Sequence, residues 1–162
     1  MRIHQIHIFI SHSWWYSQHY DRLASWLFRA HWTVGGTDLR FRDYSASRDR
    51  PIEDAPTIRA LRRKIHQKIS RCHVLVIPTG MYANHSYWIR QEIDAARIWG
   101  KPILAVDPWG ALRTSSVVSR AAERTVGWRA RSVVQATWDL YSERHAFDEA
   151  SEAPKQHYLP SR

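Results

Sequence analysis

Glu92 lies in a segment that is expected to form a helix with one apolar side facing the core. The residues around it recur at helical spacing and form an apolar stripe of Ile89, Ile93 and Ala96. Glu92 follows Trp88 by four positions, so both side chains lie on one helical face beside that stripe. A carboxylate in this position either serves a binding or catalytic site or forms an ion pair with one of the many arginines. The residues alone leave both interpretations open.

Several other chemistries find no support in the sequence. It contains no glycine-rich phosphate-binding loop, no dinucleotide-binding fingerprint and no nucleophile elbow. His4, His7 and His12 have no acidic or cysteine partner nearby at ligand spacing, so we expect no metal site. Cys72 is the only cysteine and begins an apolar run, where a core thiol is commoner than a nucleophile.

The segments that must position these residues alternate between strand and helix patterns. Short β-prone or continuously apolar runs predict strands at residues 6–10, 41–45, 72–78, 102–106 and 125–128. Helical periodicity predicts helices at residues 16–32, 58–69, 86–99, 115–122 and 131–142. The pair Gly35-Gly36 breaks the chain after the first of these helices.

Strands that alternate with helices form a parallel sheet covered by helices on both faces. The sequence therefore predicts a doubly wound, mostly parallel α/β fold with five strands. In such sheets, ligands bind beyond the carboxyl ends of the strands, where the strand order reverses. This rule directs attention to residues 11–15, 45–56 and 79–86, and Glu92 is expected beneath the last of these loops.

The chain's 162 residues suffice for one domain with a core. We expect this domain at residues 1–142, followed by a polar, partly disordered tail at 143–162. No apolar run is long enough to span a membrane and no secretory leader is recognisable, so we expect a cytoplasmic protein with no membrane partner. The single cysteine agrees with a reducing compartment.

The net charge of +9 raises the expectation of an anionic partner. The basic residues are spread along the chain, however, and the run Arg62-Arg63-Lys64 fits the solvated face of an amphipathic helix. No recognised nucleic-acid-binding motif accompanies that run. From the sequence we therefore do not expect a nucleic-acid partner.

Several motifs in fixed order resemble those of TIR (Toll/interleukin-1 receptor) domains. They are Phe9-Ile10-Ser11-His12-Ser13, Ser86-x-Trp88-Ile89-x-x-Glu92-Ile93 and Gly100-Lys101-Pro102-Ile103. Further segments are similar to the TIR-like ThsB proteins of the bacterial Thoeris anti-phage systems. These segments are Tyr44-Ser45, Gly80-Met81-Tyr82 and residues 86–89, 101–110, 115–118 and 126–128. Together the matches extend over roughly residues 5–142.

This resemblance implies a flavodoxin-like sheet and an enzyme that cleaves the nicotinamide–ribose bond of NAD. It also implies that the ADP-ribose part becomes a cyclic or conjugated signal, which switches on a partner effector protein in anti-phage defence. A phage component is a candidate trigger. NAD is expected as substrate, with no further cofactor. TIR-type sites are often completed by a neighbouring subunit, so the resemblance also implies a homo-oligomer.

The resemblance assigns the catalytic role to Glu92 and implies a mobile loop at about residues 45–56. The candidate substrate-binding residues are Phe9, Ser11, His12, Trp14, Ser45, Tyr82, Ser86 and Trp88. Their hydroxyl and imidazole groups suit contacts with ribose or phosphate, and their aromatic rings suit stacking on a base. For Trp88, a place in the core is the stronger expectation.

A single carboxylate is a sufficient catalytic set for this reaction. Loss of nicotinamide passes through an oxocarbenium-like state, and nicotinamide leaves as a neutral molecule from a cationic precursor, so no general acid is required. Glu92 can hold the ribose hydroxyls and stabilise the developing positive charge. The rival interpretation is a non-enzymatic TIR-like module in which Glu92 is structural and the loops only assemble oligomers.

Overall fold

The computed structural model describes residues 3–11, 17–45, 57–109 and 115–152. Within these ranges the side chains of residues 17, 81–86 and 147–152 are not described. Of the predicted site residues, His12 and Trp14 lie outside the described residues, as does the loop 46–56. The side chains of Tyr82 and Ser86 are likewise not described.

Six strands form one sheet in the order β2-β3-β1-β4-β5-β6. They are β1 (Ile3–Ile10), β2 (Trp32–Val34), β3 (Thr37–Asp43), β4 (Val74–Pro78), β5 (Ile103–Asp107) and β6 (Arg124–Gly127). Neighbouring strands are parallel except for the pair of β2 and β3. The predicted doubly wound, mostly parallel sheet is confirmed, but the predicted count of five strands is wrong.

The unpredicted strand β2 is short and joins β3 through a tight hairpin. Gly35 and Gly36 form its two-residue turn, with φ angles of 56° and 79°. A type I′ turn requires positive φ at both central positions, which glycine adopts without strain. Because three residues show no clear alternation, the sequence pattern extended the preceding helix to Trp32. That helix, α1 (Ser17–Phe28), ends before β2 begins.

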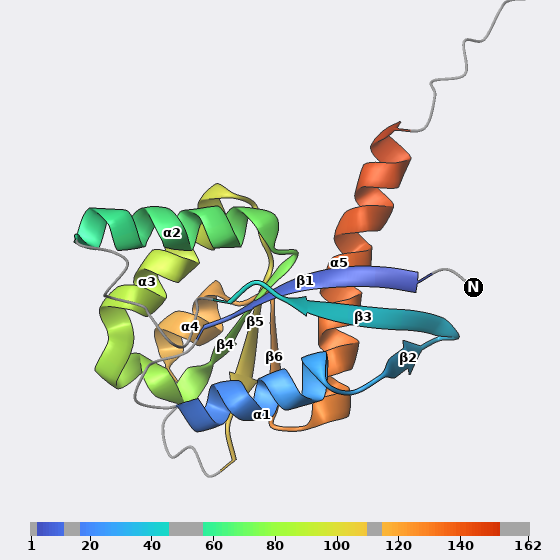
Figure 1. Cartoon of the computed structure of the whole chain (residues 1–162), viewed down its shortest axis with the longest axis horizontal. Helices are drawn as coiled ribbons and strands as arrows, with labels where there is room; N and C mark the ends of the chain where they lie inside the picture. Colours follow the sequence, from blue (N-terminus) through green and yellow to red (C-terminus); the bar gives the residue numbers. More distant parts are fainter. Residues whose placement is uncertain (1–2, 12–16, 46–56, 110–114, 153–162) are drawn as a thin grey trace, which may run out of the picture.

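In the described part of the chain, five α-helices cover the two faces of the sheet (Figure 1). On one face lie α1 and α5 (Ala130–Glu152), and on the other α2 (Ile58–Arg71), α3 (Tyr82–Ile98) and α4 (Ser116–Ala121). Successive side chains of a strand point to opposite faces. In β1, accordingly, Ile8 and Ile10 pack with α1 and α5, whereas Phe9 packs with α2, α3 and α4.

Besides the end of α1, two further helix ends differ clearly from the sequence prediction. α3 begins at Tyr82, before the predicted start at residue 86, and α5 continues to Glu152, past the predicted end at Ser142. The expected stop at Gly100 is confirmed, because this glycine adopts a φ of 63° directly after Trp99. The division of the chain at residue 142 stays a prediction.

A group of rings gathers beside the start of β4. The His73 ring lies 4.6 Å from that of His7, 5.1 Å from that of Tyr141 and 5.5 Å from that of His145, measured between centroids. Its Nδ1 accepts a hydrogen bond of 2.8 Å from the backbone N–H of His7, so this nitrogen carries no proton. Burial first, and then the charges of His7, His145 and Lys101, lower the pKa of His73 to about 4.

We expect acid to weaken the fold through His73. The unfolded chain protonates this imidazole near its ordinary pKa of 6.5, and the folded chain only near about 4, so the contribution of His73 to stability falls as the pH falls through that interval. His73→Asn keeps a hydrogen-bond acceptor but does not titrate. Its unfolding free energy, measured by urea denaturation, should depend less on pH in this interval. An unchanged slope in His73→Asn would contradict the assignment.

Candidate functional site

The carboxyl ends of β1 and β4 adjoin at the point where the strand order reverses. From β1 the chain continues to β3 on one side, and then returns to β4 on the other side of β1. The parallel strands therefore follow the flavodoxin-like order, in which ligands bind beyond these two carboxyl ends. The residues that directly follow the two strands are Ser11 and Thr79.

Ser11 and Glu92 meet beneath this edge of the sheet. Ser11 stays attached to the sheet because its N–H donates a hydrogen bond of 2.8 Å to the carbonyl of Val76. Alternation along β1 turns its side chain to the same face as that of Phe9, where α3 packs. Its hydroxyl donates a hydrogen bond to the Glu92 carboxylate. Ser11 is 1% exposed and Glu92 7%, so the pair is almost completely removed from water.

The surroundings of Glu92 disfavour its charged form. Burial raises its pKa from 4.5 to about 8, and the hydrogen bond from Ser11 offsets part of that rise. Within the described ranges, Oε2 of Glu92 has no hydrogen-bond partner and the carboxylate has no ion-pair partner. The ion-pair interpretation therefore finds no partner in that part of the chain. A buried carboxyl group with an open oxygen is costly, and such groups concentrate at functional sites.

Ser45, two positions after the end of β3, is fixed by three hydrogen bonds. Its hydroxyl accepts one of 2.8 Å from the N–H of Ile10, and its own N–H donates one of 2.8 Å to Asp43 Oδ1. Lys68 Nζ donates a third, of 2.9 Å, to its carbonyl. Asp43 also accepts a hydrogen bond from the hydroxyl of Tyr20. Ser45 thus holds the exit of β3 against the end of β1, and its contact with a substrate stays a prediction.

We expect Lys68→Met to lower the free energy of unfolding by about 1–2 kcal/mol, because a hydrogen bond from a charged donor is lost while the apolar stem remains. Arg63→Met removes one positive charge from the exposed side of the same helix and is the matched control, with an expected loss below about 0.5 kcal/mol. Chemical denaturation measures both variants. Equal losses would show that the Lys68–Ser45 contact contributes nothing specific.

Thr79 and Asp107 add polar groups to the same edge, and Asp107 was missed in the sequence. The Thr79 hydroxyl donates a hydrogen bond of 2.6 Å to Asp107 Oδ1, which joins the ends of β4 and β5. The carbonyl of Thr79 accepts a bond of 3.3 Å from the N–H of Ser115, before α4. Asp107 directly follows the strand predicted at residues 102–106, so the rule that selects residues 79–86 also applies to it.

Phe9 and Trp88 pack below this edge. Phe9 is 1% exposed and lies in the core between the sheet and α2, α3 and α4. Trp88 is half-buried against the same core, and its ring stands at 81° to that of Tyr87. The stronger expectation for Trp88, a place in the core, is thus confirmed. For both residues a direct contact with substrate stays a prediction.

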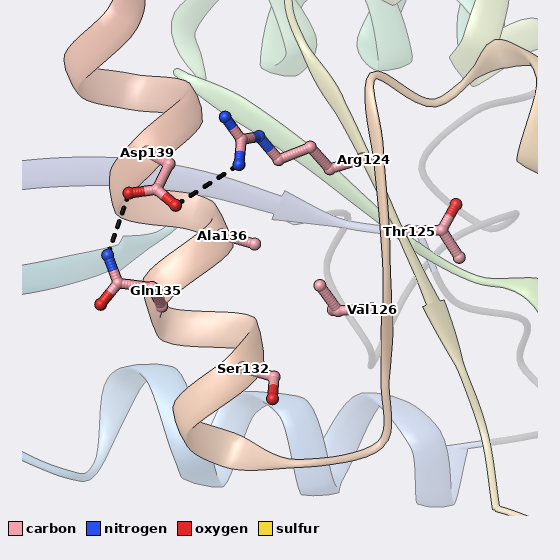
Figure 2. A pocket seen from close by; sticks show the side chains of 7 residues that line it. All are labelled: Arg124, Thr125, Val126, Ser132, Gln135, Ala136 and Asp139. Atoms are coloured by element: carbon pink, nitrogen blue, oxygen red, sulfur yellow. Dashed lines mark hydrogen bonds and ion pairs between the residues drawn. The ribbon is translucent and has the colours of Figure 1, made fainter.

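A separate shallow pocket lies between β6 and α5 (Figure 2). Its volume is about 380 Å³, and it is lined by Arg124, Thr125, Val126, Ser132, Gln135, Ala136 and Asp139. Arg124 and Gln135 both contact Asp139, at 3.5 Å and 2.9 Å. Neither Ser11 nor Glu92 belongs to its wall, so this pocket is distinct from the candidate site.

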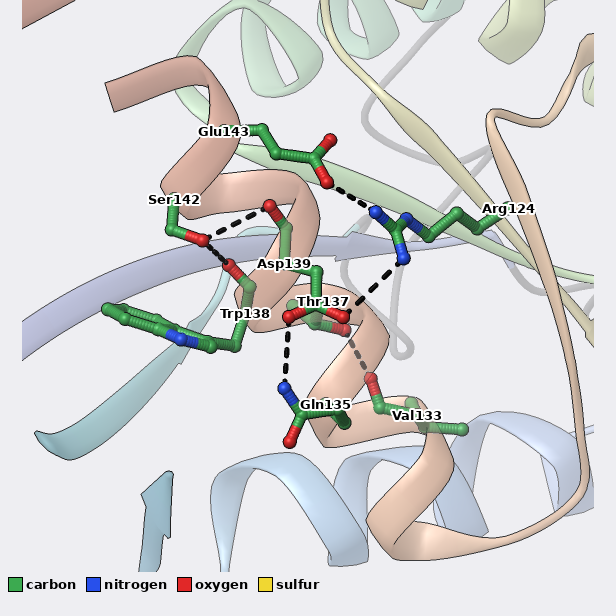
Figure 3. Close-up of polar contacts among 8 residues, drawn as sticks. All are labelled: Arg124, Val133, Gln135, Thr137, Trp138, Asp139, Ser142 and Glu143. Atoms are coloured by element: carbon green, nitrogen blue, oxygen red, sulfur yellow. Dashed lines mark hydrogen bonds and ion pairs between the residues drawn. The ribbon is translucent and has the colours of Figure 1, made fainter. Parts of the chain in front are cut away.

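The polar groups around this pocket tie β6 to α5 (Figure 3). The Arg124 guanidinium bridges Asp139 and Glu143 on successive turns of α5. The hydroxyls of Thr137 and Ser142 donate to carbonyls one turn earlier in the same helix, at 2.7 Å and 2.8 Å. The network thus attaches β6, an edge strand of the sheet, to α5.

Among the described residues, no helix is long and apolar enough to cross a membrane. No group of three or more His, Cys, Asp or Glu side chains in the same ranges is arranged to hold a metal ion.

Cys72 is fully buried, and burial raises its pKa to about 12, which confirms its expected place in the core.

Fold and site together define a class of protein: a flavodoxin-like α/β domain with a buried carboxyl group beneath the reversal of strand order. A sequence model described as "Thoeris protein ThsB, TIR-like domain" matches residues 9–113, which is more than half of the chain. The chain therefore belongs to the ThsB family of TIR-like domains, which confirms the resemblance seen in the motifs. The matched range contains Ser11, Thr79 and Glu92.

Among solved structures, the chain is similar to the CMP N-glycosidase BcmB of Clostridium botulinum. The sequence identity is 15% and the TM-score 0.46, over 83% of this chain and 98% of that chain. A comparison with curated protein sequences finds no match.

Proposed function

We propose that this protein cleaves the nicotinamide–ribose bond of NAD and that Glu92 is its catalytic carboxylate. The observation that carries the proposal is the buried Glu92 carboxyl group, which Ser11 orients and whose Oε2 has no partner among the described residues. Membership of the TIR-like ThsB family supports the choice of substrate. The position beneath the carboxyl ends of β1 and β4 supports the choice of site.

The proposed reaction needs one negative charge beside the ribose. The bond between the ribosyl carbon and the nicotinamide nitrogen breaks, and its electron pair stays with nicotinamide, which leaves neutral. Positive charge then develops on the ribosyl carbon and its ring oxygen, where the Glu92 carboxylate stabilises it. Attack on that carbon by a hydroxyl or ring nitrogen of the remaining nucleotide gives a cyclic product, attack by a separate acceptor molecule gives a conjugated product, and attack by water gives linear ADP-ribose. A hydroxyl or water nucleophile releases its proton to the solvent.

The raised pKa of Glu92 fits a cationic substrate. Without substrate, a pKa of about 8 keeps the carboxyl group mostly protonated at neutral pH. The positively charged nicotinamide ring of NAD favours the ionised form when it lies close by, because an opposite charge lowers the pKa of a carboxyl group. Substrate binding therefore creates the charge that the reaction uses. The Ser11 hydroxyl supplies a donor that stabilises this charge.

In the proposed cellular role, the ADP-ribose-derived product is the signal that switches on an effector protein in anti-phage defence. Family membership supports this role. We further propose that a homo-oligomer completes the site and that a phage component is the trigger. The rival is a TIR-like module without enzymatic activity.

The test is NAD turnover by purified protein at high concentration, with products separated by liquid chromatography and identified by mass spectrometry. We expect nicotinamide together with one ADP-ribose species, whose mass and retention distinguish linear from cyclic or conjugated products. The assay is repeated with lysate of phage-infected cells as a source of the trigger. Absence of nicotinamide under both conditions would favour the non-enzymatic module.

A further inference from the structure

The helix α2 carries basic side chains and no acidic one. Its six basic residues are Arg59, Arg62, Arg63, Lys64, Lys68 and Arg71. Residues 58–98, which include α2 and α3, contain eight basic and two acidic residues, and one of these acids is the buried Glu92. The segment thus holds six of the nine net positive charges of the chain. A surface of this kind attracts polyanions.

Two aromatic rings of the α3 region stand beside this basic row. Tyr87 is 45% exposed, and its hydroxyl accepts a hydrogen bond of 2.9 Å from Arg62 Nη2. Trp99, directly after α3, is 50% exposed, and its indole N–H donates to His66 Nδ1 at 3.2 Å. Side chains of α2 therefore hold the polar edges of both rings, while half of each residue remains accessible.

We propose that this surface binds single-stranded nucleic acid. It consists of Arg59, Arg62, Arg63 and His66 of α2 with Tyr87 and Trp99 from the α3 region. Arginine suits phosphate because its guanidinium can donate two parallel hydrogen bonds. Exposed aromatic rings next to a basic row are the arrangement on which unpaired bases stack. The 14 residues of α2 span about 21 Å, so the basic row can contact several successive phosphates of one strand.

The same surface is less suited to an anionic membrane. Six of the eight basic residues between positions 58 and 98 are arginines, whose planar fork favours phosphate groups in a defined geometry over a diffuse negative surface. The hydrogen bonds that join Tyr87 to Arg62 and Trp99 to His66 also hold the two rings against α2, where they can stack but cannot insert deeply into lipid. The structure places Tyr87 beside Arg62 and Trp99 beside His66, 25 and 33 positions apart in the sequence. No local sequence pattern indicates these contacts.

The test is fluorescence anisotropy with a labelled oligothymidylate of about 20 nucleotides and with a duplex of equal length. We expect the single strand to bind more tightly than the duplex at about 50 mM salt and to weaken steeply at about 200 mM. The double variant Arg59→Gln/Arg63→Gln should lower the affinity at least about tenfold. It should also reduce the slope of log affinity against log salt by about 1.4, since each phosphate contact of a single strand contributes about 0.7.

A matched control removes two exposed arginines elsewhere. Arg120→Gln/Arg131→Gln, on α4 and α5, makes the same change in net charge and should alter the affinity less than about twofold. Tyr87→Ala and Trp99→Ala should each weaken the single strand about fivefold or more and leave the duplex nearly unchanged. Circular dichroism verifies the fold of each variant.

Three outcomes would overturn the proposal. The first is no binding of the single strand at low salt, and the second is an equal loss in the control pair. The third is binding to phosphatidylserine vesicles without binding to the oligonucleotide, which would identify a membrane surface instead. NAD turnover is not part of this test, so its result is independent of the proposed enzymatic activity.

Discussion

We expect Glu92→Gln to lower NAD turnover by roughly 10³-fold, which is about 4 kcal/mol of transition-state stabilisation. The substitution keeps the size of the side chain and its ability to hydrogen-bond Ser11, but it cannot place a negative charge beside the ribosyl carbon. Nicotinamide release under saturating NAD measures the effect. Because the interaction is made mainly in the transition state, kcat should fall much more than the apparent affinity for NAD.

Asp94→Asn is the matched control for this variant. Asp94 lies two positions further along α3, is exposed, and loses the same charge in an equivalent exchange of carboxylate for amide. We expect it to retain turnover within about twofold. A normal rate in Glu92→Gln would remove Glu92 from the mechanism. Equal losses in both variants would point to a general effect of charge on α3 rather than to a carboxylate at the site.

Most of the fold could be predicted because its signals are local. The continuous apolar runs of β4 and β5 and the helical stripe of α2 each appear within a few residues, and the structure has them where the sequence indicates. The hairpin strand β2 was missed because Trp32–Val34 is held by pairing with β3 and has too few residues for a periodic pattern. The sequence ends α5 too early, because the residues after Ser142 are mostly polar and predict a tail although the helix continues to Glu152.

The candidate site was predictable in outline and not in detail. Helical spacing identifies Glu92 as a carboxylate on a partly apolar face, and the rule for parallel sheets identifies the end of β1. That Ser11 bonds Glu92 depends on how α3 packs on the sheet across 81 positions of sequence, which no local pattern encodes. The same applies to the hydrogen bond between Thr79 and Asp107, because the ends of β4 and β5 meet only in the folded sheet.

The raised pKa of Glu92 also has a consequence for stability that does not depend on any substrate. In the folded chain the carboxyl group keeps its proton up to about pH 8, whereas in the unfolded chain it loses the proton near pH 4.5. At this site the folded state binds more protons than the unfolded state between these values, so the contribution of Glu92 to stability falls as the pH rises. Glu92 therefore contributes most to the free energy of unfolding when its carboxyl group is protonated. That contribution is lost as the pH rises through the folded pKa of about 8.

Glu92→Gln should remove this dependence, because an uncharged amide stays neutral where the carboxyl group ionises. Relative to the wild type, we expect its free energy of unfolding to increase by about 4 kcal/mol between about pH 5 and pH 9. Urea denaturation at several pH values measures the difference. His73 titrates equally in both proteins, and the Cys72 thiol, with a pKa of about 12, stays neutral over most of this interval. If the difference in unfolding free energy between the two proteins did not change with pH, Glu92 would already ionise near its ordinary pKa in the folded protein. In that case burial would not be the force that prepares this carboxylate for a cationic substrate.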